Sequence, residues 1–489
     1  MSLPPRVRPS SDLADRSFAT LTLRERLPVI LTRIISMLSA RGAPANEASK
    51  ALLAEMVALK YDLWHNKPML PVADDLHDAA KWRAYFAAAL EAEAQNGGAS
   101  AESKSAACWS SLDMLYSEGY LYRRIRSSCL VTEGLLALTP LPNPEPTTTS
   151  ASHGDDGKPL ALPLNLDDVF ESDKRTAFAA AQSSILALSS LLTSSLEDLQ
   201  QPVRRAELLT QQFMQMLEFS LWGNKTDLSL HPSATNKEEL LKELQSSELS
   251  QLNALRPAIL ANAASEIWAH IQLLDQQLAP ESCVRFDFVL DNAGYELFTD
   301  LILAEWLTSA PLFASGRKVD VYFHVKDYGW YVSDVTKRDF HWMVNQLACS
   351  TEPVVHALGR RWRDVRLGDA TAAGQGKWHI VEHEYWTLPG DYHELPTLAS
   401  DLYATLQQSN LLIFKGDLNY RRLIGDRLWI PTTPFSTALH TFHPAPLCTL
   451  RTLKAEVVAG LAPGVAKRTA EQDAAWLSNG RWALISFDK

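Results

Sequence analysis

The stretch FDFVLDNAGYELFTDLILAEWL, residues 286–307, decides the fold. Its first five residues form the kind of apolar run that is typical of a strand buried on both faces of a parallel sheet. Residues 296–307 then carry apolar side chains at helical spacing. A strand that passes directly into a helix is the repeating unit of an α/β fold. The polar residues Asp291, Asn292 and Glu296 lie at the junction between the two.

Other short apolar runs in the same half of the chain alternate with helical patterns. These runs are VDVYFHV (319–325), WHIVEHEYW (378–386), LLIFKG (411–416) and ALISF (483–487). The alternation predicts an α/β fold with a mostly parallel sheet flanked by helices over residues 251–489. In such sheets ligands bind beyond the carboxyl ends of the strands.

The preceding part of the chain has a different pattern. Apolar residues recur at helical spacing over residues 24–132 and again over 168–278. We therefore predict an all-helical N-terminal part, residues 1–250. Residues 139–165 are rich in Pro, Ser, Thr and Gly, a composition that favours a long surface insertion in this part.

Length and composition limit the classes of protein. A chain of 489 residues is long enough for two substructures. The net charge of -11 and the lack of a long basic tract argue against nucleic acid as a partner. No apolar run approaches the roughly 18 residues that a membrane span requires, so we expect no membrane partner. The first twenty residues lack the apolar core of a signal peptide, so we expect a cytoplasmic and possibly also nuclear location. Five scattered cysteines without a CxxC pair disfavour disulfides and a thiolate zinc site.

Asp291 and Asn292 have two interpretations. They could be N-caps of the following helix, because short polar side chains accept hydrogen bonds from helix N–H groups. They could instead form half of a hard-cation site, because Mg²⁺ and Mn²⁺ prefer carboxylate and amide oxygens. Glu296 could orient a metal-bound water or be an exposed helix residue.

A second junction of this kind occurs in GWYVSDVTKRDFHWMV, residues 329–344. We expect a short strand, then Ser333 and Asp334, then a helix. Asp334 could also be only an N-cap. Two acidic strand ends in neighbouring βα units can converge on one point, which a single cap cannot do.

A third junction, residues 413–429, combines a strand with a charged cluster. The cluster is Lys415, Asp417, Asn419, Arg421 and Arg422. Downstream, LCTLRTLKAEVV at 447–458 adds Arg451 and Lys454. These charges could form a solvated face. They could also cradle a phosphate, because guanidinium and ammonium groups together with helix-end N–H groups suit a phosphoryl group.

Several catalytic signatures do not occur in the sequence. There is no GxSxG or HExxH motif, no complete P-loop, and no GxGxxG after a predicted strand. The histidines His324, His341 and His383 are interpreted as structural residues.

Four motifs in order resemble the damage-control phosphatase family, which is also called acidic residue methyltransferase-like. They are LDNAGYEL (290–297), VSDVT (332–336), FKGDLNYR (414–421) and LRTLK (450–454). The last is similar to the Arg-Thr-x-Lys motif that marks one subgroup of the family. RERLPVI (24–30), YLYRRI (120–125) and WGNKTDLS (222–229) extend the similarity over most of the chain.

The resemblance implies a metal-dependent phosphoric monoester hydrolase that acts on sugar phosphates such as fructose 1-phosphate and fructose 6-phosphate. We expect a monomer. The implied cofactor is a divalent metal: manganese, nickel, cobalt or magnesium. The implied metal ligands and catalytic residues are Asp291, Asn292 and Asp334. The implied substrate-binding residues are Asp291, Asn292, Asp417, Leu418, Asn419, Tyr420, Arg421 and Lys454.

Weaker candidates and alternative functions accompany this interpretation. Asn224 and Asp227 could line the cleft or cap a turn, and Lys415 and Arg451 could contribute positive charge. Attack by water and attack by Asp291 are both compatible with the residues. The alternative enzyme is an S-adenosylmethionine-dependent carboxyl methyltransferase, although the glycine-rich loop expected for it is missing. A non-catalytic scaffold would leave the polar junctions unexplained.

Overall fold

The computed structural model describes residues 3–12, 14–40, 47–96, 107–138, 168–223, 237–279, 282–368 and 376–489. Contacts within the chain define two compact units. One consists of Met1–Arg6 with Asp173–Lys489, and the other of Val7–Ser172. The insertion predicted at 139–165 and the candidates Asn224 and Asp227 lie outside the described residues.

The unit Val7–Ser172 is built from helices. Its elements are α1 (Phe18–Leu21), the π-helix η1 (Thr22–Arg26), α2 (Leu27–Ala40), α3 (Glu47–Trp64), α4 (Ala79–Asn96) and α5 (Met114–Leu138). Each of two neighbouring helices has one apolar face, because its buried residues recur at helical spacing. Examples are Leu31 and Leu38 in α2, and Leu52 and Met56 in α3. This burial explains why the helical spacing of the sequence predicts the helical character of this part of the chain.

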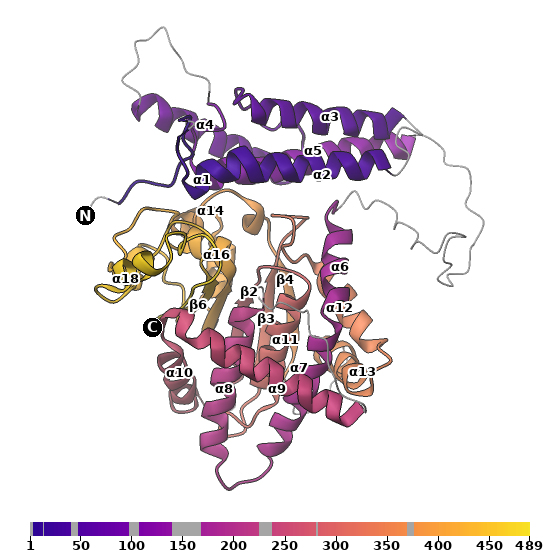
Figure 1. Ribbon diagram of the computed structural model, residues 1–489, viewed down its shortest axis with the longest axis vertical. Coiled ribbons are helices and arrows are strands. Elements are labelled where there is room, and N and C mark those ends of the chain that lie inside the picture. The colour runs from indigo at the N-terminus through magenta and orange to yellow at the C-terminus, as the bar shows by residue number, and fades with distance from the viewer. Residues whose placement is uncertain are drawn as a thin grey trace, which may run out of the picture. The chain divides into compact units, whose positions relative to one another are not determined.

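The other unit contains a seven-stranded sheet with the strand order β1-β7-β6-β5-β2-β3-β4. The strands are β1 (Ile259–Asn262), β2 (Val284–Val289), β3 (Val319–Val325), β4 (Trp378–Glu382), β5 (Leu411–Lys415), β6 (Leu447–Thr452) and β7 (Ala483–Asp488). All neighbouring pairs are parallel except β6 and β7, which are antiparallel. The predicted α/β class with a mostly parallel sheet is therefore confirmed (Figure 1).

Helices cover the sheet. The longer ones are α6 (Glu171–Ala180), α7 (Gln182–Asp198), α8 (Arg205–Trp222), α9 (Lys237–Leu255), α10 (Ala264–Gln277), α11 (Tyr295–Ser309), α12 (Lys337–Ala348) and α13 (Pro353–Arg360). The shorter ones are η2 (Arg256–Ala258), η3 (Arg361–Arg366), η4 (Glu384–Thr387), η5 (Tyr392–Glu394), α14 (Leu395–Leu398), α15 (Ser400–Leu406), α16 (Gly416–Leu423), α17 (Phe435–Ala438) and α18 (Val465–Gln472). Helices α7 and α8 and most of α9 precede residue 250, yet they belong to the compact unit that contains the sheet.

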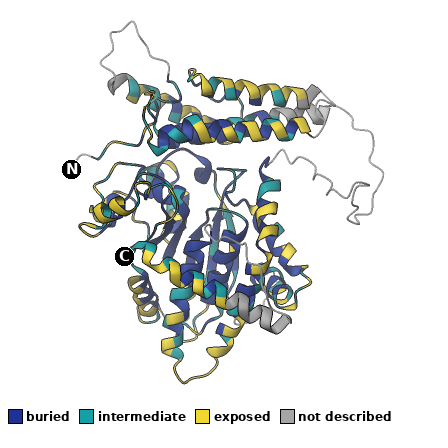
Figure 2. Cartoon of the chain, viewed as in Figure 1, coloured by how far each residue is buried: buried dark blue, intermediate teal, exposed yellow. Residues whose placement is uncertain are grey.

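Helix α11 is the central helix of this unit. Every residue from Tyr295 to Leu307 is buried, because α11 packs against β3 as well as against α7 and α8. Figure 2 shows the strands and much of this layer in the colour of buried residues. A helix enclosed on all sides has no solvated face, so the charged residues that it carries need partners inside the protein.

Among the described residues, no single helix is long and apolar enough to cross a membrane. Helices α6 and α7 pass the same test only as a pair, with a bend of 63° between them. In α7, Ile185, Leu188 and Leu192 belong to the apolar core beside the sheet. The apolar character of α7 is thus accounted for by packing within the unit.

Candidate functional site

The junction between β2 and α11 does not use Asp291 or Asn292 as helix caps. The N-cap of α11 is Gly294, which has φ +74 and makes no side-chain cap. Instead, the Asn292 Nδ2 group donates to Asp291 Oδ2 and to Glu296 Oε2, both at 2.8 Å. The capping interpretation of Asp291 and Asn292 is therefore wrong.

The junction between β3 and α12 also differs from the expectation in detail. Residues 331–333 form a turn, not a strand, with positive φ angles at Tyr331 and Val332. The N-cap of α12 is Thr336, which forms a capping box with Asp339. The predicted short strand is wrong, and so is the interpretation of Asp334 as an N-cap.

The structure brings these two junctions together. Asn292 and Asp334 form an isolated antiparallel bridge. The Val335 N–H donates to the Asp291 carbonyl oxygen at 2.8 Å, and the Ala293 N–H donates to the Ser333 carbonyl oxygen at 2.7 Å. The two acidic residues thus lie on adjacent backbone segments beyond the carboxyl ends of the neighbouring strands β2 and β3.

The third junction, between β5 and α16, lies against the same carboxylate. Gly416 begins α16 with φ +82, and a Cβ atom added there would lie 1.9 Å from Asp291 Oδ2. Only glycine allows the backbone to approach this closely and to adopt this φ. Three βα junctions therefore meet at Asp291.

Burial and mutual repulsion perturb the two carboxyl groups. Burial raises the pKa of Asp291 well above its ordinary value, and the negative charges of Glu296 and Asp334 raise it further. Burial raises the pKa of Asp334 to about 6 against the opposing effect of Lys326 and Lys174. Carboxyl groups perturbed in this way cluster at functional sites.

Two lysines contribute positive charge at this point. Lys326 Nζ lies 3.4 Å from Asp334 Oδ2, and burial lowers the pKa of this lysine. The charge of Lys454 acts on Asp291 and opposes the rise of its pKa. Lys454 was predicted from the sequence, whereas Lys326 was missed. The signal that could have revealed Lys326 is its position directly after the apolar run of β3.

Asp417 and Lys454 lie together, and Arg451 holds them. Arg451 Nε donates to Asp417 Oδ1 at 2.8 Å, and the backbone N–H of Lys454 donates to the same oxygen at 3.0 Å. Arg451 also donates to the carbonyl oxygens of Val457 and Ala455. The guanidinium group of Arg451 therefore positions Asp417 and the loop that carries Lys454.

The other predicted substrate-binding side chains are buried and engaged within the protein. These are Leu418, Asn419, Tyr420 and Arg421. Asn419 Nδ2 donates to the carbonyl oxygens at the end of β2 and to that of Lys415, while its Oδ1 accepts from the Tyr392 hydroxyl at 2.6 Å. Arg421 forms an ion pair with Asp426 at 2.9 Å. The part of this segment that suits an anion is the N-terminal turn of α16, where helix N–H groups lack helical acceptors.

Glu296 and Lys415 form a second, deeper layer. Glu296 is only 4% exposed, so the interpretation of this residue as an exposed helix glutamate is wrong. Lys415 Nζ lies 2.9 Å from Asp300 Oδ1 and donates to the Ser220 hydroxyl and carbonyl oxygens. Asp300 and Ser220 were not predicted, because their positions within long helices give no sequence signal.

The donor set around Asp291 fits a hard divalent cation. Within the described ranges no group of three or more His, Cys, Asp or Glu side chains forms a metal-binding cluster. The set predicted from the sequence contains only two such side chains, those of Asp291 and Asp334, because its third donor is the amide oxygen of Asn292. Asp334 Oδ2 is buried without a hydrogen-bond partner and has Lys326 Nζ as its counter-charge. A buried, repelling set of carboxylate and amide oxygens is the chemistry that Mg²⁺ or Mn²⁺ accepts.

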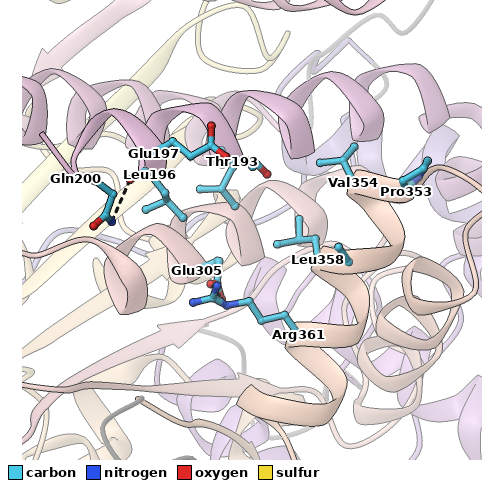
Figure 3. Close-up of a pocket in the computed structure, with 11 residues that line it drawn as sticks. Thr193, Leu196, Glu197, Gln200, Glu305, Pro353, Val354, Leu358 and Arg361 are labelled. Atoms are coloured by element: carbon cyan, nitrogen blue, oxygen red, sulfur yellow. Dashed lines mark hydrogen bonds and ion pairs between the residues drawn. The ribbon is translucent and has the colours of Figure 1, made fainter.

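A pocket of about 600 Å³ lies elsewhere in this unit and contains none of the predicted residues. Figure 3 shows apolar side chains of α7 and α13 on its walls, with Glu305 and Arg361 beside each other. Arg361 Nε lies 2.8 Å from Glu305 Oε1, and Arg366 pairs with the same carboxylate at 2.9 Å. The charges of Glu305 and Arg361 are thus paired within the protein.

Comparison with known proteins gives a consistent result. The family model described as the damage-control phosphatase ARMT1-like domain matches residues 22–469. The chain is 35% identical over 484 residues to damage-control phosphatase ARMT1 of Mus musculus, with 96% of each chain covered. It is 33% identical over 483 residues to the Homo sapiens protein of that name and 35% over 486 residues to that of Xenopus laevis, again with 96% of each chain covered. This chain belongs to the ARMT1-like damage-control phosphatase family.

Proposed function

We propose that this protein is a metal-dependent phosphatase that hydrolyses phosphate monoesters of sugar phosphates. The observation that carries the proposal is the meeting of three βα junctions at Asp291. Asn292, Asp334 and Gly416 all lie against this residue or its backbone. Membership of a phosphatase family supports hydrolysis as the reaction.

Asp291, Asn292 and Asp334 would hold the divalent cation through their side-chain oxygens. When bound, such a cation acts as a Lewis acid that polarises a phosphoryl oxygen and offsets negative charge in the transition state. Manganese, nickel, cobalt and magnesium are the candidates. Lys326 keeps the charge balance of the buried acids, because its ammonium group pairs with Asp334.

The remaining residues of the site bind and orient the substrate. The charge of Lys454 acts on Asp291, so its ammonium group would compensate the charge of a phosphoryl group bound there. The N–H groups in the first turn of α16 supply further donors for the same anion. Asp417, which Arg451 holds in place, is available to accept hydrogen bonds from sugar hydroxyl groups. Ketose phosphates such as fructose 1-phosphate and fructose 6-phosphate carry both a phosphoryl group and sugar hydroxyl groups, which are the two groups that this arrangement fits.

The direct test is a screen of the purified protein against sugar phosphates with each of the four metals. We expect metal-dependent release of inorganic phosphate. Asp291→Ala should reduce the rate of phosphate release by at least about a thousandfold, because the Asp291 carboxylate is proposed to contact both the cation and the substrate. The variant should keep its circular dichroism spectrum. Asp401→Ala is the matched control, because the Asp401 side chain is 78% exposed.

Other outcomes would contradict the proposal in distinguishable ways. Methyl transfer from labelled S-adenosylmethionine without phosphate release would favour the methyltransferase. No turnover of either kind, together with a melting temperature that metal does not change, would favour a non-catalytic scaffold.

A further inference from the structure

The amide of Asn292 is fixed in one orientation. Its Nδ2 group lies 2.8 Å from both Asp291 Oδ2 and Glu296 Oε2. Carboxyl oxygens are the acceptors that an amide N–H group requires, so this orientation pairs the amide donor with both acids, whereas the opposite orientation would place the amide oxygen against two acceptor oxygens. The Ser333 hydroxyl donates to Asn292 Oδ1 from the opposite side. The amide oxygen, which is the atom able to bind a hard cation, therefore points away from Glu296.

Glu296 also contacts a buried lysine on the side away from Asn292. It is 4% exposed, and its Oε1 atom lies 3.8 Å from Lys415 Nζ. Lys415 is fully buried and paired with Asp300 at 2.9 Å. The Ser220 hydroxyl donates to that Asp300 oxygen at 2.6 Å. A continuous set of polar contacts thus runs from helix α8 to the Asn292 amide.

We propose that Glu296 is a positioning residue, which fixes the Asn292 amide so that Oδ1 faces the divalent cation. Glu296 does not itself bind the cation, since its Oε2 atom accepts from Asn292 and its Oε1 atom faces Lys415. The inference rests on the metal site of the proposed function. Residues that orient metal ligands in this way typically affect metal affinity by about 10- to 100-fold.

The test is a titration of the metal-free protein with Mn²⁺, followed by the loss of the free-ion electron paramagnetic resonance signal. Glu296→Ala should weaken Mn²⁺ binding by about 10- to 100-fold, because the amide can then rotate. Glu296→Gln should recover most of this loss, because the glutamine carbonyl oxygen can still accept from Asn292 Nδ2. Recovery by glutamine separates an orienting role from a requirement for the negative charge.

The matched control is Glu305→Gln on the same helix. Glu305 is 1% exposed, but its partners are Arg361, which lies beside it in Figure 3, and Arg366, rather than Asn292. This variant should have a lower melting temperature and an unchanged Mn²⁺ affinity. It therefore shows whether a buried Glu-to-Gln change on α11 alters metal binding merely through lost stability. If Glu296→Ala does not fold, Glu296→Met replaces it, since methionine fills a similar volume without an acceptor.

Two results would overturn the inference and are distinguishable. If the unaltered protein binds Mn²⁺ and releases phosphate, and a folded Glu296→Ala or Glu296→Met variant binds Mn²⁺ equally well, Glu296 has no positioning role and the proposed function stands. If the unaltered protein does not bind any of the four metals, both the inference and the metal dependence fail.

Discussion

At the scale of single residues, the closest constraint in the site is the contact between Gly416 and Asp291. The Asp291 carboxylate occupies the space that a side chain at position 416 would need, because an added Cβ atom would lie 1.9 Å from Asp291 Oδ2. A methyl group there must displace either the carboxylate or the start of α16. This one glycine thus links the position of the acidic residues to that of the proposed phosphate-binding turn.

Gly416→Ala should therefore abolish Mn²⁺ binding and phosphate release, and should lower the free energy of unfolding by more than about 2 kcal/mol. Gly316→Ala is the control: Gly316 has a similar φ of +72, but no atom lies within 4 Å of an added Cβ. The control should lose only about 1 kcal/mol from backbone strain and keep metal binding. Equal effects of the two substitutions in a metal titration and a denaturant titration would show that the contact has no special role.

The sequence predicts part of the site at this scale and not the rest. The proximity of Asp291 and Asp334 follows from parallel strand ends, which share one edge of a sheet. The burial of Glu296 does not follow, because a glutamate in the first turn of a helix is usually solvated. The pairing of Arg421 with Asp426 depends on a turn in which Asp426 has a positive φ. Such a turn leaves no clear pattern in a single sequence.

At the scale of elements, the turn that carries Asp334 is anchored by helix α6. Lys174 Nζ donates to the Asp334 carbonyl oxygen and to Asp339 Oδ2, both at 2.7 Å. Asp339 also completes the capping box of α12 with Thr336. One buried ammonium group therefore connects α6, the turn and the start of α12.

Lys174→Met should lower the free energy of unfolding by about 3 kcal/mol, because it leaves a carboxylate without its buried partner. Amide hydrogen exchange should accelerate over residues 331–336. Lys337→Met is the control: its side chain is 49% exposed and pairs with Glu382, so the expected change is below about 1 kcal/mol. Unchanged exchange in the turn after Lys174→Met would show that α6 does not anchor it.

Prediction of the strands succeeded where the apolar run was continuous and failed where it was not. The runs beginning at 286, 319, 378, 411 and 483 all correspond to strands, although the run from 378 ends earlier because η4 begins at Glu384. Strand β1 was missed, because four residues between two helices carry too little pattern. Strand β6 was missed as an element, because the charged Arg451 and polar Thr452 fall inside it.

At the scale of the whole molecule, buried acids make stability depend on pH. Burial raises the pKa of Asp300 from 3.8 to about 7, against the opposing effect of Lys415. Between these two values the folded protein keeps a proton that the unfolded chain has lost. The stability contributed by this group is therefore complete below the lower value and is lost as the pH rises through the higher one.

Asp300→Asn should flatten this dependence in the metal-free protein, since asparagine does not titrate. Asp300 contributes on the order of 1 kcal/mol per pH unit to the slope of the free energy of unfolding against pH, and the substitution should remove this contribution. Melting temperatures of the two proteins in chelator, measured between pH 4 and pH 8, give the comparison. The variant should be less stable overall, because Lys415 loses its partner, so the slope and not the absolute stability is the readout. Parallel slopes would contradict the prediction.

The position of β7 has a consequence for synthesis. This strand lies between β1 and β6 and pairs with both. During translation β1 leaves the ribosome long before residues 483–488 exist, so it has no neighbour in the sheet until the end. The N-terminal residues Pro4 and Pro5 likewise find their hydrogen-bond partners only when Arg427 and Leu428 have been made. A nascent chain therefore exposes the unpaired edge of β1 from the synthesis of this strand until that of β7, and this unit is expected to complete its sheet only then.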